Sequence, residues 1–182
     1  MKNTNEPDEE FLTTDQWLSI FCGLKIGLLQ SREGLHRKLV KEDDEAWQAV
    51  IFGYAFAFVR NIHPLWVLAR ENQDYDAVFK WMENGIVQRV PVQLKMLPAM
   101  NPKETIDGLL EKAKKYSGND LFLVLFMNRS EFFTTITVPR LQIRQLWLWG
   151  WSKPDHSEIY LARVDLEKPE TFRVPFRPTP RS

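Results

Sequence analysis

The sequence has a single cysteine and three histidines among its 182 residues. The lone thiol, Cys22, excludes an intrachain disulfide and leaves too little sulfur for a cysteine-based zinc site. The histidines, at positions 36, 63 and 156, are far apart and lack the spacing of a metal-ligating pair. We therefore expect no disulfide framework and no zinc site of these types.

An excess of charge of either sign is also missing, because 24 Lys and Arg balance 24 Asp and Glu. This balance argues against a protein that coats nucleic acid non-specifically, since such affinity comes mostly from cations that replace counterions on phosphates. The balance does not exclude a local basic groove, because net charge does not describe where the charges lie on the surface. The acids gather in 1–10 and 41–45, whereas 102–116 and the residues beyond 171 are locally basic.

No apolar run reaches the roughly 20 residues that a bilayer span needs. The longest stretches, 17–29 and 46–59, contain Lys25 and Gln48, and the acidic start MKNTNEPDEE is unlike a signal peptide. We expect a cytoplasmic protein with no membrane partner. With 44% hydrophobic and 13% aromatic residues, the chain has enough apolar material for one folded domain.

Residue periodicity predicts an α/β fold with a mixed central sheet flanked by helices. Asn84-Gly85 between two β-rich runs is a strong hairpin signal. The run 121–127 lacks polar alternation, which is typical of a strand buried on both faces. The expected helices are 14–30, 43–61, 102–116 and 139–146, and the expected strands are 65–69, 77–82, 86–97, 121–127, 146–151 and 158–166.

Two of these helices have specific start signals. Asn101, Pro102 and Glu104 suit the N-cap, first and third positions of one helix, which Gly118 would end. The acids over 43–45 suit the first turn of another, where the helix dipole favours negative charge.

The chain is expected to divide into three parts. A flexible acidic arm covers 1–12, a single α/β domain covers 13–170, and an irregular tail rich in Pro and Arg covers 171–182. Within the domain, a core of about 43–127 precedes an aromatic, β-rich extension over 128–170.

The segment that carries chemistry is the predicted hairpin. Asp76 directly precedes its first strand, and Gln93 and Lys95 lie on its second strand at positions that share a face. A carboxylate, an amide oxygen and an ammonium at one strand end favour a site for Mg²⁺ and water. The plainer interpretation makes Asp76 a turn residue and the other two a solvent-facing polar stripe.

This pattern resembles the PD-(D/E)xK nuclease superfamily, the restriction-endonuclease-like proteins. The shared features are a helix, a hairpin bearing Asp76 and then Gln93-Leu94-Lys95, a helix and a buried strand, over about 43–127. The sequence VPVQLK is similar to the QxK variant of the Mrr-type branch. The resemblance departs at Tyr75, where the family commonly has Pro, and at Gln93, which supplies no negative charge.

The resemblance implies a nuclease that hydrolyses DNA with Mg²⁺ or Mn²⁺. It implies Asp76 and Gln93 as metal ligands, Lys95 as the residue that steadies the attacking water or the phosphate charge, and Glu45 as a further ligand, with Asp44 as its substitute. The alternative is a catalytically inactive module of the same fold that acts in protein or nucleic-acid binding and assembly.

Other residues admit more than one interpretation. Trp147, Trp149 and Trp151 alternate along one strand face, so their indoles would stack on bases, fill a core, or form a homodimer interface through 141–151. His63 before a proline suits a phosphate contact or a capping role. Five cations suit phosphate contacts or ordinary solvated surfaces, namely Lys112, Lys114, Lys115, Arg140 and Arg144.

Overall fold

The computed structural model describes residues 11–21, 36–69, 75–99, 103–128 and 136–177. Residues 14–21 are helical, and the rest of the helix expected over 14–30 lies outside the described residues. The other elements are β1 (Leu12–Thr13), α2 (His36–Arg60), β2 (Trp66–Ala69), β3 (Ala77–Glu83), β4 (Ile86–Leu97), α3 (Ile106–Ala113), β5 (Gly118–Met127), β6 (Ile143–Trp151), β7 (Glu158–Arg163) and β8 (Glu170–Pro175).

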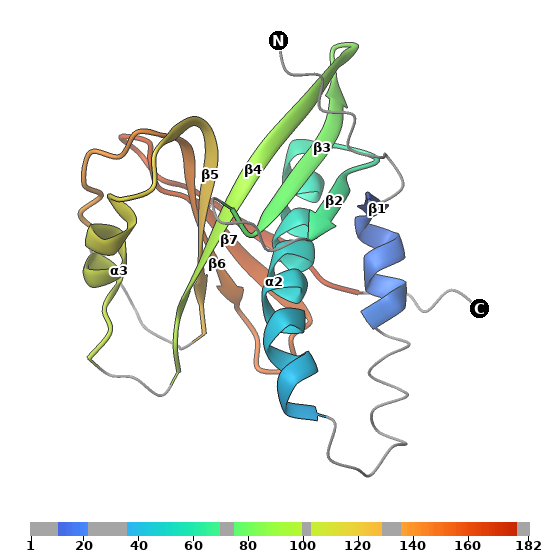
Figure 1. The fold of residues 1–182 in the computed structure, drawn as a ribbon, viewed down its shortest axis with the longest axis horizontal. Helices are drawn as coiled ribbons and strands as arrows, with labels where there is room; N and C mark the ends of the chain where they lie inside the picture. Colours follow the sequence, from blue (N-terminus) through green and yellow to red (C-terminus); the bar gives the residue numbers. More distant parts are fainter. Residues whose placement is uncertain (1–10, 22–35, 70–74, 100–102, 129–135, 178–182) are drawn as a thin grey trace.

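The eight strands form one sheet in which every strand lies beside its neighbour in the chain, from β1 to β8 (Figure 1). The pairs from β1 to β4 and from β6 to β8 are antiparallel, whereas β4–β5 and β5–β6 are parallel. Parallel neighbours need a crossover connection, and α3 lies in the one from β4 to β5. The α/β class with a mixed sheet and flanking helices is as the sequence predicts.

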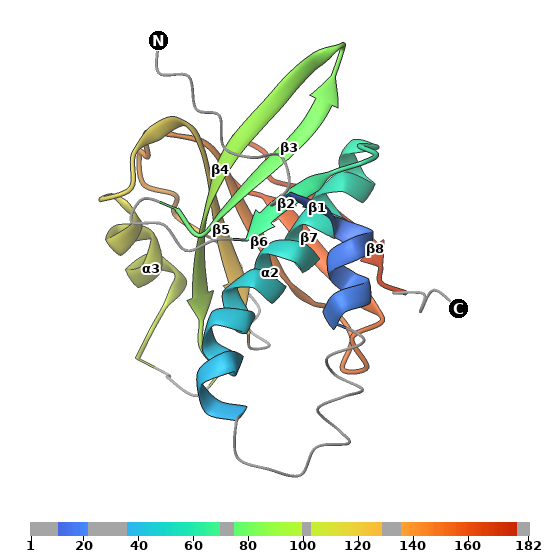
Figure 2. The same cartoon turned by 45° about the vertical axis from the view of Figure 1, so that its right-hand side comes forward.

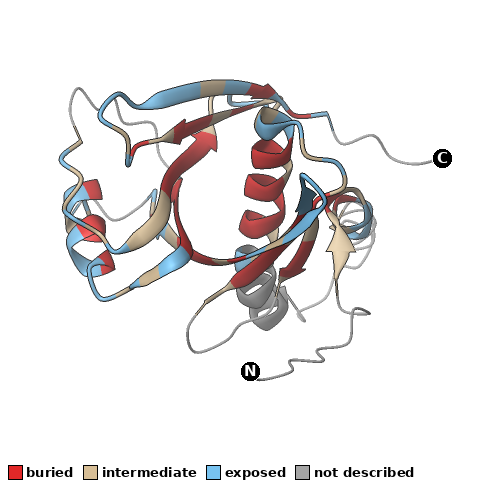
Figure 3. Cartoon of the chain, turned by 90° about the horizontal axis from the view of Figure 1, so that it is seen from above, coloured by how far each residue is buried: buried red, intermediate tan, exposed pale blue. Residues whose placement is uncertain are grey.

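The long helix α2 packs on one face of the sheet, which curves around it (Figure 3). Phe52 of α2 contacts Phe79 of β3 and Trp147 of β6, with ring centroids 5.7 and 6.1 Å apart. Phe56, one turn later, lies 5.7 Å from the same indole. The nearly all-round apolar sequence of 46–59 is explained by this position, because the curved sheet buries more than one side of the helix.

The second face of the sheet is covered by α3 over its parallel part. Ile106, Leu109 and Leu110 of this helix are buried. Because both α2 and α3 press on the middle of the sheet, residues 121–126 of β5 are buried without alternation, as predicted. The strand residues that pack with α3 include Leu97, Leu123, Leu125, Leu146 and Leu148.

The start of α3 differs from the sequence prediction. Its N-cap is Thr105, whose side-chain oxygen accepts the backbone N–H of Gly108 at 3.0 Å. Thr is a strong N-cap residue in its own right, so the helix begins later than the Asn101 signal indicates. Asn101 itself lies outside the described residues, and Gly118 begins β5 instead of ending the helix.

Two further predictions are wrong. Residues 139–142 are not helical, and 143–146 belong to β6, because pairing with β5 satisfies their backbone groups. The segment expected as an irregular tail forms most of β8, which pairs with β7 throughout. Its apolar positions, Phe172 and Val174, are spaced by two and contribute to the core beneath α2.

The helix α2 starts earlier than expected, at His36, and no acidic residue lies in its first turn. The acids over 43–45 are therefore well inside the helix and are not explained by its N-terminal dipole. None of the helices in the described ranges has the length and apolar character needed to cross a membrane.

Candidate active site

Asp76 and Gln93 are brought together at the end of the β3–β4 ladder. The last strand pair joins Ala77 to Val92, and the backbone N–H of Asp76 donates to the carbonyl of Val92 at 2.9 Å. Asp76 therefore lies opposite Gln93, whose side-chain amide donates to the Asp76 carboxylate. The same carboxylate oxygen accepts the backbone N–H of Leu94 at 2.6 Å.

This contact lies where the two strands part. β4 continues from Gln93 to Leu97 and pairs there with β5, whereas β3 begins only at Ala77 (Figure 1). The Asp76 carboxylate accepts the backbone N–H of Leu94. At this position β3 has no paired residue whose carbonyl could accept that hydrogen bond. The carboxylate consequently fixes the end of β3 against β4. It also places a negative charge at the point where the two strands separate.

Gln93 is a buried polar residue, 4% exposed. Its amide nitrogen is engaged with Asp76 and lies 3.5 Å from the carbonyl of Leu94. Its side-chain oxygen accepts no hydrogen bond from the part of the chain that the structure describes. This oxygen is not among the fully buried atoms that lack a partner, so it is accessible to a water or a cation beside Asp76.

Lys95 is half-buried and shares the α3-side face of β4 with Gln93. Its ammonium nitrogen lies 5.1 Å from the ring centroid of Tyr116, directly after α3. Lys115 lies 4.9 Å from the same centroid. The ring attracts both cations, and Lys95 follows Gln93 two residues later on the same strand face. The sequence analysis did not identify Tyr116 as a neighbour of Lys95, because no local signal joins residues from these two elements.

The acidic residues of α2 are less closely tied to this arrangement. Glu45 is exposed, and the side chain of its substitute, Asp44, lies outside the described residues. Three residues after Glu45, the buried Gln48 donates toward the sulfur of Met96 in β4 at 3.9 Å. Met96 faces α2, whereas Gln93 and Lys95 lie on the α3-side face of β4, so α2 and Glu45 are on the other side of the sheet from them.

The donors at Asp76 and Gln93 fit one kind of metal. Both supply oxygen, which suits a hard cation such as Mg²⁺, and neither is a thiolate or imidazole. Across the described residues, no three His, Cys, Asp or Glu side chains gather to hold a metal ion. A cation here would need oxygens from water and from a phosphate, which is how Mg²⁺ is commonly bound.

The tryptophan cluster is part of the core. Trp147 and Trp149 are 1% and 0% exposed, and Trp149 stacks on Phe126 with centroids 4.2 Å apart. Of the three, only Trp151 is partly exposed, and it stacks on His156. Of the interpretations that the sequence leaves open, the structure bears out the core for Trp147 and Trp149, because α2 covers that face. A homodimer through 141–151 stays a prediction.

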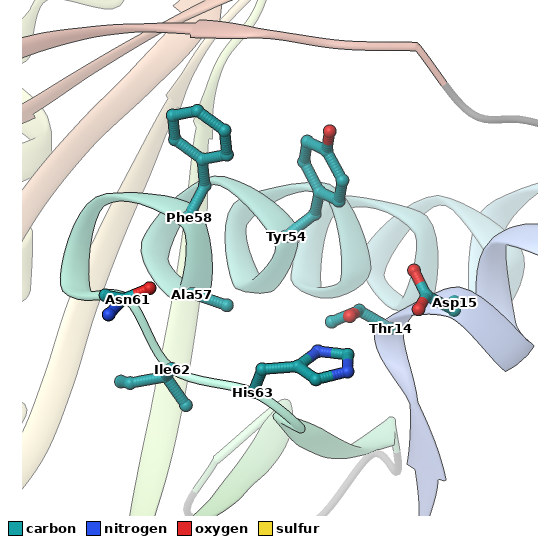
Figure 4. A pocket seen from close by; sticks show the side chains of 8 residues that line it. All are labelled: Thr14, Asp15, Tyr54, Ala57, Phe58, Asn61, Ile62 and His63. Atoms are coloured by element: carbon teal, nitrogen blue, oxygen red, sulfur yellow. The ribbon is translucent and has the colours of Figure 1, made fainter.

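His63 lines a cleft of about 370 Å³ away from the hairpin (Figure 4). The imidazole points into the space between α2 and the start of the 14–21 helix, near Thr14. Across the cleft, burial raises the pKa of Tyr54, and the Asp15 carboxylate raises it further. Asp76, Gln93 and Lys95 do not line this cleft, so His63 takes no part in their arrangement.

The cations on and after α3 are mostly in surface ion pairs. Lys112 pairs with Glu104 at 2.7 Å, and Lys114 pairs with Glu111 at 2.6 Å. On the other side of the sheet, Arg144 donates to Gln88 at 3.5 Å. These contacts match a solvated surface. Arg140 is exposed beside a second cleft of about 450 Å³.

No protein-family model, curated protein or solved structure matches this chain.

Proposed function

We propose that this chain is a metal-dependent nuclease of restriction-endonuclease-like type that hydrolyses phosphodiester bonds of DNA with Mg²⁺ or Mn²⁺. The observation that carries the proposal is the contact of Asp76 with Gln93 at the point where β3 and β4 part. Lys95 follows on the same strand face. An oxygen-donor pair and a cation in this arrangement suit the handling of a phosphate.

The order of elements supports the proposal. Helix α2 is followed by the antiparallel strands β2, β3 and β4, then by α3 and by β5, which is parallel to β4. The two helices lie on opposite faces of the sheet. This succession agrees with the one on which the resemblance to the restriction-endonuclease-like proteins rests.

Each residue has a distinct role in the proposed reaction. Asp76 holds the cation, and the side-chain oxygen of Gln93 orients a water or completes the ligand set. When bound, Mg²⁺ lowers the pKa of a water ligand and neutralises charge on the phosphate. Lys95 stabilises the negative charge that develops on the phosphate oxygens. The role of Glu45 as a further carboxylate rests on the resemblance alone, because α2 lies on the face of the sheet opposite to Asp76, Gln93 and Lys95.

One observation favours the alternative, an inactive module of the same fold in binding or assembly. The Asp76 oxygen that accepts from Gln93 also accepts from the Leu94 backbone. A carboxylate used in this way has a structural reason to be present without any metal. The two proposals differ in one measurable respect, because only the nuclease requires Mg²⁺ or Mn²⁺ to bind.

The test is a cleavage assay on supercoiled plasmid and on linear duplex DNA with Mg²⁺ or Mn²⁺. We expect the wild-type protein to cut, and Asp76→Asn and Lys95→Ala each to lower the rate by about 100-fold or more, as loss of one charge-stabilising group does. Lys114→Ala is the matched control, because Lys114 is an exposed lysine paired with Glu111.

Absence of cleavage with either metal, or a wild-type rate in Lys95→Ala, would overturn the nuclease proposal. Titration calorimetry with Mn²⁺ gives an independent measurement. Heat that disappears in Asp76→Asn supports a metal site, whereas no heat in the wild-type protein supports the inactive module.

A further inference from the structure

The cleft at the end of α2 lies away from the candidate active site. The 14–21 helix lies beside α2, and its start lies by the end of α2 (Figure 2). Farther along, Phe21 packs against Trp47 of α2, with ring centroids 5.2 Å apart. Because Asn61 and His63 follow α2 directly, the cleft of about 370 Å³ has walls from three segments. The proposed nuclease reaction uses none of the residues that line it.

Thr14 is the most buried polar residue that lines this cleft, at 8% exposed. Its backbone N–H donates to the carbonyl of Leu65 at 3.2 Å. Its hydroxyl group has no hydrogen-bond partner in the described ranges, and its oxygen is not among the fully buried atoms. The oxygen is therefore accessible from the cleft, where the His63 imidazole points toward it (Figure 4). Such a hydroxyl group is available to a ligand.

Helix capping does not explain Thr14, because the neighbouring Thr13 is the N-cap residue. The backbone N–H of Gln16 donates to the Thr13 hydroxyl at 3.2 Å, and the Gln16 side-chain oxygen accepts the Thr13 N–H at 2.7 Å. This reciprocal pair is a capping box. Because it uses N–H groups that an anion would need, the start of this helix is poorly suited to binding an anion.

The formal charge of the cleft is negative. Asp15 is its acidic residue, and no Lys or Arg is among the described residues that line it. The Asp15 carboxylate forms no ion pair and accepts no hydrogen bond within the part of the chain that the structure describes. Burial raises the pKa of Tyr54 first and the Asp15 carboxylate raises it second, so the charge of Asp15 acts across the cleft.

The end of α2 adds partial negative charge. The last carbonyl groups of a helix form the negative end of its dipole, which favours cations. α2 ends at Arg60, and the next two residues, Asn61 and Ile62, line the cleft. Arg60 is the basic residue of that last turn, but it is exposed and does not line the cleft. A cationic ligand is therefore favoured here over an anionic one.

The cleft also offers aromatic surface. Phe58 is 56% exposed, and Tyr54, one turn earlier, stands on the same side of α2 (Figure 4). The Tyr54 hydroxyl donates to the carbonyl of Pro175 at 3.2 Å, which fixes the position of its ring. Aromatic rings attract cations and also pack against the apolar part of a ligand.

We propose that this cleft binds a small molecule that carries a primary ammonium group beside an aromatic or apolar part. The ammonium group pairs with the Asp15 carboxylate and donates to the Thr14 hydroxyl and to a ring nitrogen of His63. Its three N–H donors thus match three acceptors from three segments. The apolar part lies against Phe58. This site goes beyond the proposed nuclease function and does not rest on it.

The test compares three probes that share one ring. Benzylamine carries a positive charge, benzyl alcohol is neutral, and benzoate is negative. An NMR chemical-shift titration of the full chain gives the affinity for each. We expect benzylamine to bind about tenfold more tightly than benzyl alcohol, because hydrogen bonds to charged groups are the stronger ones. Benzoate is expected to bind most weakly, because Asp15 repels it.

Substitutions place the effect in the cleft. Asp15→Asn keeps the size of the side chain and is expected to weaken benzylamine about tenfold while benzyl alcohol changes less than about twofold. Thr14→Val keeps the branched shape and is expected to weaken benzylamine by about two- to tenfold. The matched control is Asp120→Asn, at an exposed position in β5, where benzylamine is expected to stay within about twofold of wild type.

Thermal unfolding checks that each variant folds. If Asp15→Asn does not fold, Thr14→Val and the three probes decide. Equal affinities for benzylamine and benzyl alcohol, tighter binding of benzoate, or no binding of benzylamine by the wild-type protein would each refute the proposed site. So would a loss in Asp120→Asn as large as that in Asp15→Asn, which would assign the effect to overall charge. A loss confined to Asp15→Asn and Thr14→Val supports the site, whether or not the protein cuts DNA.

Discussion

The Asp76 carboxylate and the backbone N–H of Leu94 are joined by a 2.6 Å hydrogen bond beyond the last paired residue of β3. Leu94 is 3% exposed, so water cannot readily replace this acceptor. Asp76 therefore stabilises the fold as well as forming the candidate site. Stability and metal binding at this position have to be measured separately.

We predict that Asp76→Ala lowers the free energy of unfolding by about 1–3 kcal/mol, because it leaves a buried N–H without its acceptor. Asp76→Asn keeps an oxygen acceptor and is expected to lose less. Urea denaturation measures both. The control is Asp120→Ala at an exposed position, where a change within about 0.5 kcal/mol is expected. Equal losses at the two aspartates would contradict the structural role.

The ring of Tyr116 is predicted to influence cleavage through Lys95. Tyr116→Phe keeps the ring and is expected to leave the cleavage rate within twofold of wild type. Tyr116→Leu removes the cation–π contact, worth about 0.5–1 kcal/mol, and is expected to slow cleavage by about two- to fivefold. Single-turnover rates measure the effect. A larger loss in Tyr116→Phe than in Tyr116→Leu would assign the effect to the hydroxyl group.

Trp147 is predicted to act in stability alone. It is 1% exposed and lies against Phe52 and Phe56 of α2, so Trp147→Ala is expected to cost about 3–5 kcal/mol of unfolding free energy. Chemical denaturation gives this value, and light scattering is expected to give the same mass before and after the substitution. A change in mass with little loss of stability would restore the interface interpretation.

Tyr54 gives a prediction for alkaline pH. Its pKa is raised above the ordinary 10.0, by burial first and by Asp15 second. The folded state therefore holds the phenol proton more tightly than the unfolded state. The contribution of this proton to stability is complete below pH 10. It is lost as the pH rises through the pKa that Tyr54 has in the folded state. The stability difference between wild type and Tyr54→Phe should shrink in that range. A difference that stays constant there would contradict this.

The β3–β4 hairpin could be predicted from the sequence because local chemistry determines it. Asn84 and Gly85 have positive φ angles of 52° and 77°, the conformation that an Asn-Gly turn favours. Once the turn is fixed, the register follows, and it places Asp76 opposite Gln93. Strand β5 was equally predictable from the sequence, because an unbroken apolar run of this length fits a strand that is covered on both faces.

Elements that depend on distant partners were not predictable in the same way. Residues 143–146 have a helix-compatible pattern, and only pairing with β5 makes them a strand. β8 has prolines and arginines around it, yet β7 pairs with all of it. The cation–π contact of Lys95 with Tyr116 joins residues from two elements, and no local signal marks it.

The agreement between strand order and chain order has a kinetic consequence. Hairpins close short loops, whereas the two parallel pairings each require a longer closure with a larger entropy loss. Asp76 and Gln93 are separated by only 17 residues within one hairpin. We therefore expect their contact to form early in folding, and the rate-limiting barrier to lie in the crossovers that add β5 and β6 to a sheet edge already carrying the candidate site.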